Sequence, residues 1–400
     1  MTTDAGQDLV SGVAWSRFCD RLKLAGERLL AEDFPGTSVD RAEGYRHLTR
    51  LLTFALDWAV ESNDPEFPVF TRTNDDRIKW GGMNADNRNL RARIDGRGSY
   101  RMVGNVGQMH DFLVTLKQGD MQLGTGRTFA EASSAELATD GEGNIEILLS
   151  GERPLGYEGN WMPLEATVSY VMIRQYFYDW ESEQAGWFAI EKLGNEGRAP
   201  ERPDPARLAG ALDEAATWVE GTLTFWNDYQ LTARGEEVDN QLGRPHYVQD
   251  APAAINYGNG FFDLGEGEAL LVEVDEPQAR YWSVQLYDLG WFESLDFANR
   301  TSSLNGAQVH LDDDGRCRLV VAAEDPGVLN WLDTAGHRQG MILYRWVWPT
   351  SSEIPQPHSR VVRIDTLDAL LPPGTARVSP SERAATIRRR RIHVMQRYHR

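Results

Sequence analysis

The chain has 400 residues, with 60 acidic and 41 basic side chains and a formal net charge of −19 at pH 7. This acid excess would repel a polyanion over most of the surface, so we expect no nucleic-acid partner. Aromatic residues make up 10% of the chain, which excludes wholesale disorder. No apolar run reaches the roughly 18 residues of a membrane-spanning helix, so we expect no membrane partner.

The N-terminal sequence and the cysteines indicate the compartment. The first 20 residues lack the basic start and apolar centre of a secretory signal. Cys19 and Cys317 are the only cysteines, too few for a disulfide framework or a Cys-rich zinc site. We therefore expect a cytoplasmic protein in which both thiols pack as small apolar groups.

Composition changes along the chain divide it into five predicted parts. Helical spacing dominates the first part, as in Trp15, Phe18 and Leu22. The parts are an N-terminal helical segment at 1–79, a β module at 80–197, a Pro-rich linker with a helical insertion at 198–250, a second β module at 251–370, and a basic C-terminal helix at 371–400.

Short β-type runs between Gly, Asn and Asp clusters predict strands and turns in both modules. The clearest predicted strands are Leu90–Ile94, Tyr100–Val106, Ile145–Leu149, Val168–Tyr178, Trp187–Glu191, Ala269–Val274, Tyr281–Tyr287, Cys317–Ala322 and Met341–Trp348. The helical insertion is centred on residues 208–231, where Ala and Leu give way to aromatic residues.

An internal repeat relates the two modules. The pair Asn160-Trp161 recurs 170 residues later as Asn330-Trp331, and a single mid-strand arginine recurs 171 residues later. These arginines are Arg174 and Arg345, and an Asp-Gly turn precedes an apolar strand in each half. A further match pairs Tyr100 with Tyr281.

The repeat predicts the fold class. Short, mostly hairpin-connected strands favour antiparallel pairing. We expect a mainly β protein with two repeated jelly-roll-like β-sandwich modules, together with an N-terminal helical segment, a helical insertion and a C-terminal helix.

Several of these stretches resemble one bacterial family, the domain of unknown function numbered 1214, which some relatives carry beside the family numbered 1254. The resemblance covers most of residues 80–350 and implies paired jelly-roll-like sandwiches, with no established reaction and no catalytic residue to carry over. The stretches on which the resemblance rests are NADNRNLRARIDGRGSYRMVGNVG (84–107), RQYFYDWESE (174–183), RTSSLN (300–305), DPGVLNWLDTAGHRQG (325–340) and LYRWVWP (343–349).

Motifs for metals, nucleotides and nucleophiles are missing from the sequence. The eight histidines show neither HxH nor HExxH spacing, and no phosphate-binding glycine loop or GxSxG turn occurs. We therefore expect no metal and no cofactor, although ligands far apart in sequence can still converge on a metal.

Carboxylates beside aromatic residues are the strongest chemical signal. A carboxyl group against an aromatic wall has a raised pKa and can act as a general acid. The predicted acid–base residues are Asp179, Glu181, Asp288 and Glu293. The predicted ligand-binding residues beside them are Tyr178, Trp180, Tyr287 and Trp291. In the structural alternative, the aspartates cap turns and the aromatic residues belong to the core.

Three further residues have both a functional and a structural interpretation. Arg174 could anchor an anionic ligand, but its recurrence as Arg345 favours a structural ion pair in each module. His246 could transfer protons, or it could be an ordinary loop histidine.

The C-terminus contrasts in charge with the rest of the chain. Residues 381–400 hold seven arginines and one glutamate, a net charge of +6, which leaves −25 on the other 380 residues. We expect this helix to dock on the acidic body of its own subunit or of a neighbour, in a possible homo-oligomer.

These features predict an enzyme that acts on a hydroxylated, glycosylated or polycyclic small molecule by cofactor-independent carboxylate acid–base chemistry. We favour a hydrolase over a lyase. The alternative is a non-catalytic protein that binds small molecules or serves in assembly, with the same aromatic residues in its core or interface.

Overall fold

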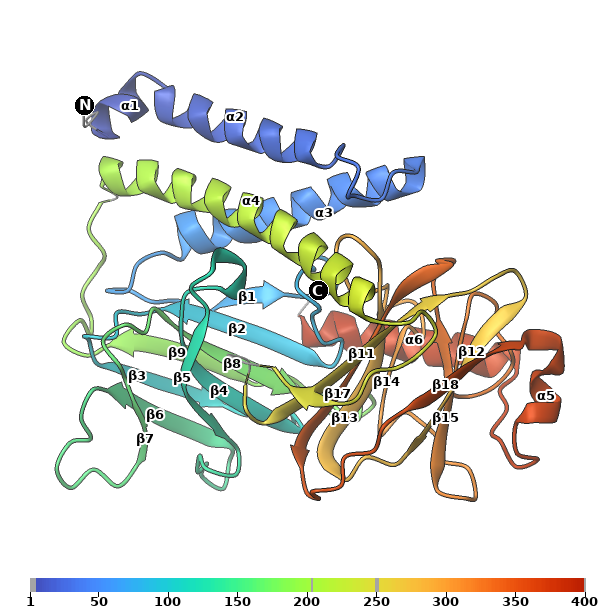
Figure 1. Ribbon diagram of the computed structural model, residues 1–400. Helices are drawn as coiled ribbons and strands as arrows, with labels where there is room; N and C mark the ends of the chain where they lie inside the picture. Colours follow the sequence, from blue (N-terminus) through green and yellow to red (C-terminus); the bar gives the residue numbers. More distant parts are fainter. Residues whose placement is uncertain (1–4, 203, 249–251, 399–400) are drawn as a thin grey trace. The chain divides into compact units, whose positions relative to one another are not determined.

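The computed structural model describes residues 5–202, 204–248 and 252–398 (Figure 1). Contacts divide the chain into two compact units that are interleaved in sequence. Unit 1 holds the chain up to Trp80, then Arg88–Tyr176 and Gln184–Trp226. Unit 2 holds Gly81–Asn87, Phe177–Glu183 and the chain from Asn227 onward. Two short segments therefore leave the first half of the sequence to join unit 2.

The predicted helical parts are confirmed. A capping box starts the longest N-terminal helix, because Thr37 and Asp40 satisfy each other's backbone N–H groups. None of the described helices combines the length and apolar character needed to cross a membrane. The helices are α1 (Ala5–Val10), α2 (Val13–Arg28), α3 (Ser38–Leu56, continued by a π-helical turn at Asp57–Glu61), α4 (Pro205–Glu236), α5 (Leu367–Leu370) and α6 (Pro380–Arg397).

Helix α2 is held to the unit 1 part of α4 by ion pairs. The guanidinium of Arg17 donates to both carboxylate oxygens of Asp213, at 3.0 and 2.8 Å. The buried face of α2 runs through Ala14, Phe18 and Ala25. Cys19 lies off that face and is exposed, so its expected packing role is wrong, whereas Cys317 is buried in its strand as expected.

Unit 1 contains a β-sandwich whose two sheets enclose one apolar core (Figure 1). One sheet has the order β1-β2-β8-β4-β5 and the other the order β7-β6-β3-β9. Its strands are β1 (Thr71–Asn74), β2 (Asn87–Arg93), β3 (Tyr100–Asn105), β4 (Asp111–Gln118), β5 (Arg127–Ser133), β6 (Asn144–Ser150), β7 (Asn160–Pro163), β8 (Tyr170–Tyr176) and β9 (Trp187–Lys192).

Unit 2 contains a second sandwich with the same arrangement. Its sheets have the orders β10-β11-β17-β13-β14 and β16-β15-β12-β18, which match the first module strand for strand. Its strands are β10 (His246–Tyr247), β11 (Ile255–Asp263), β12 (Glu268–Asp275), β13 (Ala279–Tyr287), β14 (Ser303–Asn305), β15 (Arg316–Ala322), β16 (Trp331–Asp333), β17 (Gln339–Pro349) and β18 (His358–Arg363). The predicted pair of sandwich modules is confirmed.

The repeated Asn-Trp pair has the same structural role in both modules. Asn160 Nδ2 donates to the carbonyl oxygens of Ala138 and Glu146, at 2.8 and 2.9 Å. Asn330 Nδ2 donates in the same way to His310 and Arg318, at 2.7 and 3.0 Å. Each asparagine therefore holds a short parallel strand, β7 or β16, against the strand before it.

One predicted match in the repeat is wrong. Tyr100 lies in β3, whose counterpart is β12, whereas Tyr281 lies in β13, whose counterpart is β4. Both tyrosines lie near the start of an apolar strand, so local sequence could not distinguish them. The matching arginines are confirmed, since Arg174 lies in β8 and Arg345 in its counterpart β17.

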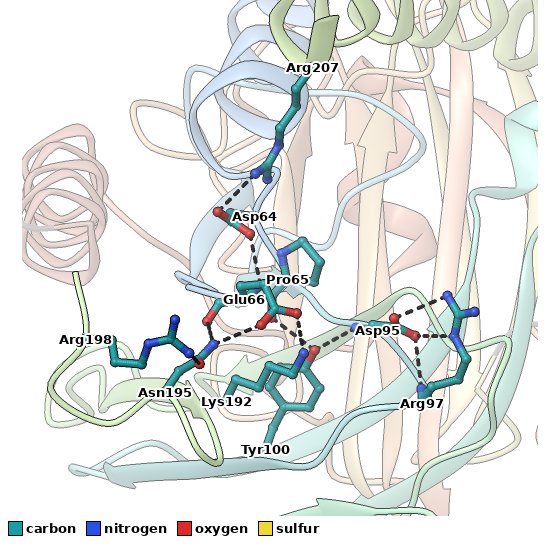
Figure 2. Close-up of polar contacts among 10 residues, drawn as sticks. All are labelled: Asp64, Pro65, Glu66, Asp95, Arg97, Tyr100, Lys192, Asn195, Arg198 and Arg207. Carbon is teal, nitrogen blue, oxygen red and sulfur yellow. Dashed lines mark hydrogen bonds and ion pairs between the residues drawn. The ribbon is translucent and has the colours of Figure 1, made fainter. Parts of the chain in front are cut away.

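Tyr100 instead fastens the loop that follows the N-terminal helices to the first sandwich (Figure 2). Its hydroxyl donates to the carbonyl oxygen of Pro65 at 3.0 Å and accepts from the backbone N–H of Asp95 at 2.9 Å. Beside it, Lys192 forms an ion pair with Glu66. Because the Tyr100 ring is fully buried, its hydroxyl depends on these two partners.

The beginning of α4 is attached to the same loop (Figure 2). Arg207 pairs with Asp64 at 3.0 Å, and Asn195 Nδ2 donates to the carbonyl oxygen of Glu66 at 3.1 Å. The linker before α4 is thus anchored within unit 1 by polar contacts at both of its ends.

We predict that Tyr100→Phe lowers the free energy of unfolding by about 1–3 kcal/mol, because two backbone groups lose a buried partner. Urea denaturation measures this change. The control is Arg97→Ala, which removes a mostly exposed ion pair with Asp95 and should change stability by less than about 1 kcal/mol. Equal effects of the two substitutions would contradict the anchoring role of Tyr100.

Candidate functional site

Asp179 and Glu181 lie on an exposed turn of unit 2. Asp179 accepts from the backbone N–H of Glu181 at 2.9 Å and from the hydroxyl of Ser182 at 2.7 Å. The Glu181 carboxylate pairs with Arg389 of α6 at 3.0 Å, where both side chains are largely exposed. One carboxylate thus caps a turn, and the other forms a surface ion pair.

Asp288 and Glu293 lie together in a buried turn after β13. The two residues exchange bonds, since Asp288 N–H donates to the Glu293 carbonyl at 3.1 Å and Glu293 N–H donates to Asp288 Oδ1 at 3.0 Å. Gln230 of α4 donates to the Asp288 carbonyl at 2.8 Å. Trp291, between them, is buried in the core. Asp288 therefore caps the turn that it occupies.

Trp180 belongs to a buried cluster around Asp86 in unit 2. The Asp86 carboxylate accepts from Trp180 Nε1 at 2.8 Å, Tyr281 Oη at 2.6 Å and Asn305 Nδ2 at 2.9 Å. Asp86 is only 1% exposed, and burial raises its pKa, while the Tyr281 hydrogen bond and nearby arginines oppose the shift. We call these four residues the Asp86 cluster. Tyr178 lies beside it, its ring centroid 5.4 Å from that of Tyr281.

The basic C-terminal helix packs on this cluster within unit 2. The ring of His393 stacks on Trp180 with centroids 5.2 Å apart, and the guanidinium groups of Arg390 and Arg397 lie 4.4 and 4.5 Å from the Trp180 ring. Burial, followed by the charge of Arg397, lowers the pKa of His393 to about 2. The cations of α6 therefore lie beside the buried carboxylate of Asp86.

Tyr287 and Arg345 meet on the outer face of the sheet that contains β13 and β17. Arg345 Nη1 donates to the Tyr287 hydroxyl at 3.0 Å, and that hydroxyl donates to the Met83 carbonyl at 2.8 Å. Arg345 is 5% exposed and also donates to the Gly82 carbonyl. Its counterpart Arg174 belongs to unit 1 and donates to Thr115 Oγ1 at 3.2 Å. Among the described residues, each arginine thus bonds to neutral oxygens and not to an acid, which differs from the expected ion pair.

Glu237, which the sequence analysis did not single out, has a carboxyl group in a different environment from the carboxylates described above. Glu237 follows the last residue of α4 and is half-buried. Asn259 of β11 donates to Glu237 Oε1 at 2.6 Å, while the buried Oε2 has no hydrogen-bond partner among the described residues. Burial raises the pKa of Glu237 to about 7, although the Asn259 bond and the charge of His246 act in the opposite direction.

His246 is the sequence-predicted residue that lies beside this carboxyl group. It stands in β10, paired with Tyr257 of β11, and its side chain is exposed. Its Nδ1 lies 3.1 Å from the carbonyl oxygen of Arg244. Because a carbonyl oxygen only accepts, Nδ1 is the donor in this contact, and Nε2 is the nitrogen whose lone pair is available in the neutral ring.

Two half-buried tyrosines complete this region. Tyr257 pairs with His246 in the sheet, and the guanidinium of Arg345 lies 5.7 Å from its ring centroid. Burial raises the pKa of Tyr229 of α4, and the charge of Glu237 adds to the effect. We call Glu237, His246, Asn259, Tyr229 and Tyr257 the Glu237 site.

Sequence reasoning missed Glu237 because its neighbouring residues give only a weak signal. One local signal was present: Glu236 and Glu237 stand at the C-terminal end of a long helix, where the helix dipole disfavours negative charge. Asn259, which fixes the carboxyl group, is 22 residues away. Among the described residues, no group of three or more His, Cys, Asp and Glu side chains is arranged to hold a metal ion.

Comparison with known proteins now identifies the chain. The family model described as "Protein of unknown function (DUF1214)" matches residues 83–178 and 266–351. The solved structure of an uncharacterized protein from Burkholderia cenocepacia is 33% identical, with a TM-score of 0.83, over 90% of this chain and 99% of that one. The chain belongs to the DUF1214 family. The resemblance seen in the sequence is confirmed.

A more distant solved structure aligns less well with this DUF1214 protein. The VPA0106 protein from Vibrio parahaemolyticus is 16% identical, with a TM-score of 0.46, over 79% of this chain and 97% of that one. No curated protein matches the sequence.

We predict that Trp180→Phe lowers the free energy of unfolding by about 1.5–3 kcal/mol, because Asp86 loses a buried donor. Chemical denaturation measures the loss. Trp15→Phe, at a tryptophan that is 59% exposed on α2, serves as the control and should change stability by less than about 0.5 kcal/mol. A loss no larger than that of the control would contradict the role of the Asp86 cluster.

A second prediction concerns the pH dependence of stability. The pKa of Glu237 is raised in the folded protein, so the folded state binds more protons than the unfolded state, and stability is lost as pH rises through 7. Glu237→Gln removes this loss. The variant should match the parent near pH 4.5 and exceed it by about 1–2 kcal/mol at pH 8, a figure reduced for partial exposure.

Urea denaturation at both pH values measures the difference. The exposed neighbour Glu236 provides the control, since Glu236→Gln should give nearly the same change at pH 4.5 and pH 8. A Glu237→Gln variant that is less stable than the parent at pH 8 would contradict the raised pKa.

Proposed function

We propose that this DUF1214 protein is a hydrolase that acts on a hydroxylated, glycosylated or polycyclic small molecule, with Glu237 as its general acid. The proposal rests on the different environments of the two carboxyl oxygens of Glu237. Oε1 is fixed by Asn259, whereas Oε2 is buried and has no partner among the described residues. An oriented carboxyl oxygen without a partner is available to a substrate.

The protonation of Glu237 suits an acid at neutral pH. With a pKa of about 7, roughly half of the carboxyl groups carry a proton at pH 7. The four carboxylates predicted from sequence are less suited to this role, because Asp179 and Asp288 cap turns and Glu181 pairs with an arginine. Glu293 shares the buried turn of Asp288.

His246 supplies the complementary base. Its Nε2 lone pair removes a proton from water while the water oxygen attacks the substrate. The bond to the leaving group breaks, and the Glu237 proton passes from Oε2 to the departing oxygen. The products are the hydrolysed substrate, a protonated histidine and an ionised glutamate, and proton exchange with water restores both residues.

The aromatic residues of the site define the substrate class. Tyr229 and Tyr257 are both half-buried, and they lie beside Glu237 or His246. Ring faces of this kind stack on sugar rings and on flat polycyclic molecules. The proposed substrate therefore combines a ring system with a cleavable bond to oxygen.

The cytoplasm remains the proposed location of this activity. Cys19 and Cys317 are both free thiols, and Cys19 is exposed. A reducing compartment is consistent with an exposed thiol that has no disulfide partner.

The test is a screen of chromogenic 4-nitrophenyl glycosides and esters with the full-length protein. Glu237→Gln should lower kcat for any substrate found by about 10²–10⁴-fold with the fold intact, as expected for loss of a general acid. Glu236→Gln is the matched control and should leave kcat within about twofold. Because the acid must be protonated, kcat should fall as pH rises above 7.

Two results would contradict the proposal. One is turnover that survives Glu237→Gln. The other is a ligand that binds tightly, is released unchanged and binds equally well to Glu237→Gln, which would favour the alternative of a non-catalytic binding protein.

A further inference from the structure

The sheet β7-β6-β3-β9 of unit 1 carries an open surface hollow on its outer face, away from the sandwich core. Trp187 of β9, at one side of the hollow, is 58% exposed. Tyr157, Glu158 and Gly159, which precede β7, lie at another side, and Glu146 of β6 lines it as well. All of these residues belong to unit 1.

The equivalent hollow of the second module is filled by the chain itself. Asn160 and Asn330 make matching bonds, so residues 157–159 correspond to residues 327–329. In unit 2, residues 376–378 run antiparallel to residues 327–329. Leu329 N–H donates to the Ala376 carbonyl at 2.9 Å, and Val378 N–H donates to the Gly327 carbonyl at 3.0 Å.

The backbone positions that bind this segment in unit 2 are partly open in unit 1. Gly159 N–H, the counterpart of Leu329 N–H, has no hydrogen-bond partner among the described residues. The carbonyls of Tyr157 and Gly159 already accept from Arg153 Nε and Nη2, at 3.0 and 3.3 Å, so the Gly159 N–H is the backbone group that remains open to a partner at the positions used in unit 2. An unpaired backbone N–H at the edge of a sheet can bind an extended peptide by strand addition.

The side chains of the hollow specify the charge of the occupant. Asp140, Glu146 and Glu158 line it, and none of its lining residues is basic. Asp140 is already bound to its own turn through Asn144. Glu146 interacts electrostatically with Arg101, and no ion pair to Glu146 or Glu158 is formed among the described residues, so both can pair with a partner. At the position of Glu146 the second module has Arg318, whose carbonyl accepts the equivalent asparagine bond. The two hollows therefore differ in charge although they share a backbone design.

We propose that the hollow in unit 1 binds an extended, basic segment of a partner protein. The segment adds as a short strand beside residues 157–159, in the manner of residues 376–378 in unit 2. Its lysine or arginine side chains pair with Glu146 and Glu158, and one of them stacks on the exposed ring of Trp187.

The test selects random nine-residue peptides displayed on phage against the full-length protein. Selected peptides should be enriched in Lys and Arg, and the best one, synthesised with a fluorescent label, gives a Kd by fluorescence anisotropy. Trp187→Ala and Glu146→Lys should each weaken binding at least tenfold. Trp15→Ala and Glu142→Lys are matched exposed controls outside the hollow and should leave the Kd within about twofold. Glu237→Gln should also leave it unchanged, which separates this proposal from the proposed enzyme activity.

Three results would overturn the proposal. The first is no enrichment over selection on the Trp187→Ala variant, and the second is enrichment of acidic or uncharged peptides. The third is Trp187-dependent binding of oligosaccharides in the same assay without peptide binding, which would assign the hollow to a glycan.

Discussion

The buried carboxylate of Asp86 is the constraint on which unit 2 depends. It accepts three hydrogen bonds from residues of three separate parts of the chain: Trp180 of the 177–183 segment, Tyr281 of β13 and Asn305 of β14. A carboxylate removed from water is costly unless its oxygens are bonded, so each of these donors is needed. The same requirement explains why the basic helix α6 packs here, with the guanidinium groups of Arg390 and Arg397 over the Trp180 ring.

This constraint reaches the proposed catalytic site through a short series of contacts. Asp86 fixes the segment 81–87, and the carbonyl groups of Gly82 and Met83 in that segment bind Arg345 and Tyr287. Arg345 in turn lies against Tyr257, which pairs with His246. The Tyr287 hydroxyl is engaged by Arg345 and Met83, whereas Glu237 Oε2 has no hydrogen-bond partner among the described residues.

The fold could be predicted from sequence where local signals were strong. The Asn-Trp pairs and the mid-strand arginines revealed the duplication, because each occupies one position of a repeated backbone. Strands β4 (Asp111–Gln118) and β11 (Ile255–Asp263) were missed. In β11 four of nine residues are Asn or Gly, which are disfavoured in strands and hide the alternation. Tertiary contacts override that preference here, since β11 pairs with β17 along its whole length.

The site could be predicted only in part, because its chemistry comes from contacts between distant residues. Carboxylates beside aromatic residues were a sound general signal, but Asp179 and Asp288 satisfy their own turns, which local sequence does not reveal. His246 was found, whereas Glu237 depends on burial and on Asn259 in another strand. A division of the chain into consecutive segments likewise could not predict that residues 81–87 and 177–183 belong to unit 2.

Direct titration of Glu237 tests the central claim. Carbon-13 NMR of protein labelled at the glutamate side-chain carboxyl carbon, with Glu237→Gln to assign the resonance, gives its protonation midpoint. We predict a midpoint near pH 7 that moves upward in His246→Gln, because the variant lacks the opposing histidine charge. A midpoint below pH 5 would show an ordinary ionised carboxylate and would contradict the proposed general acid.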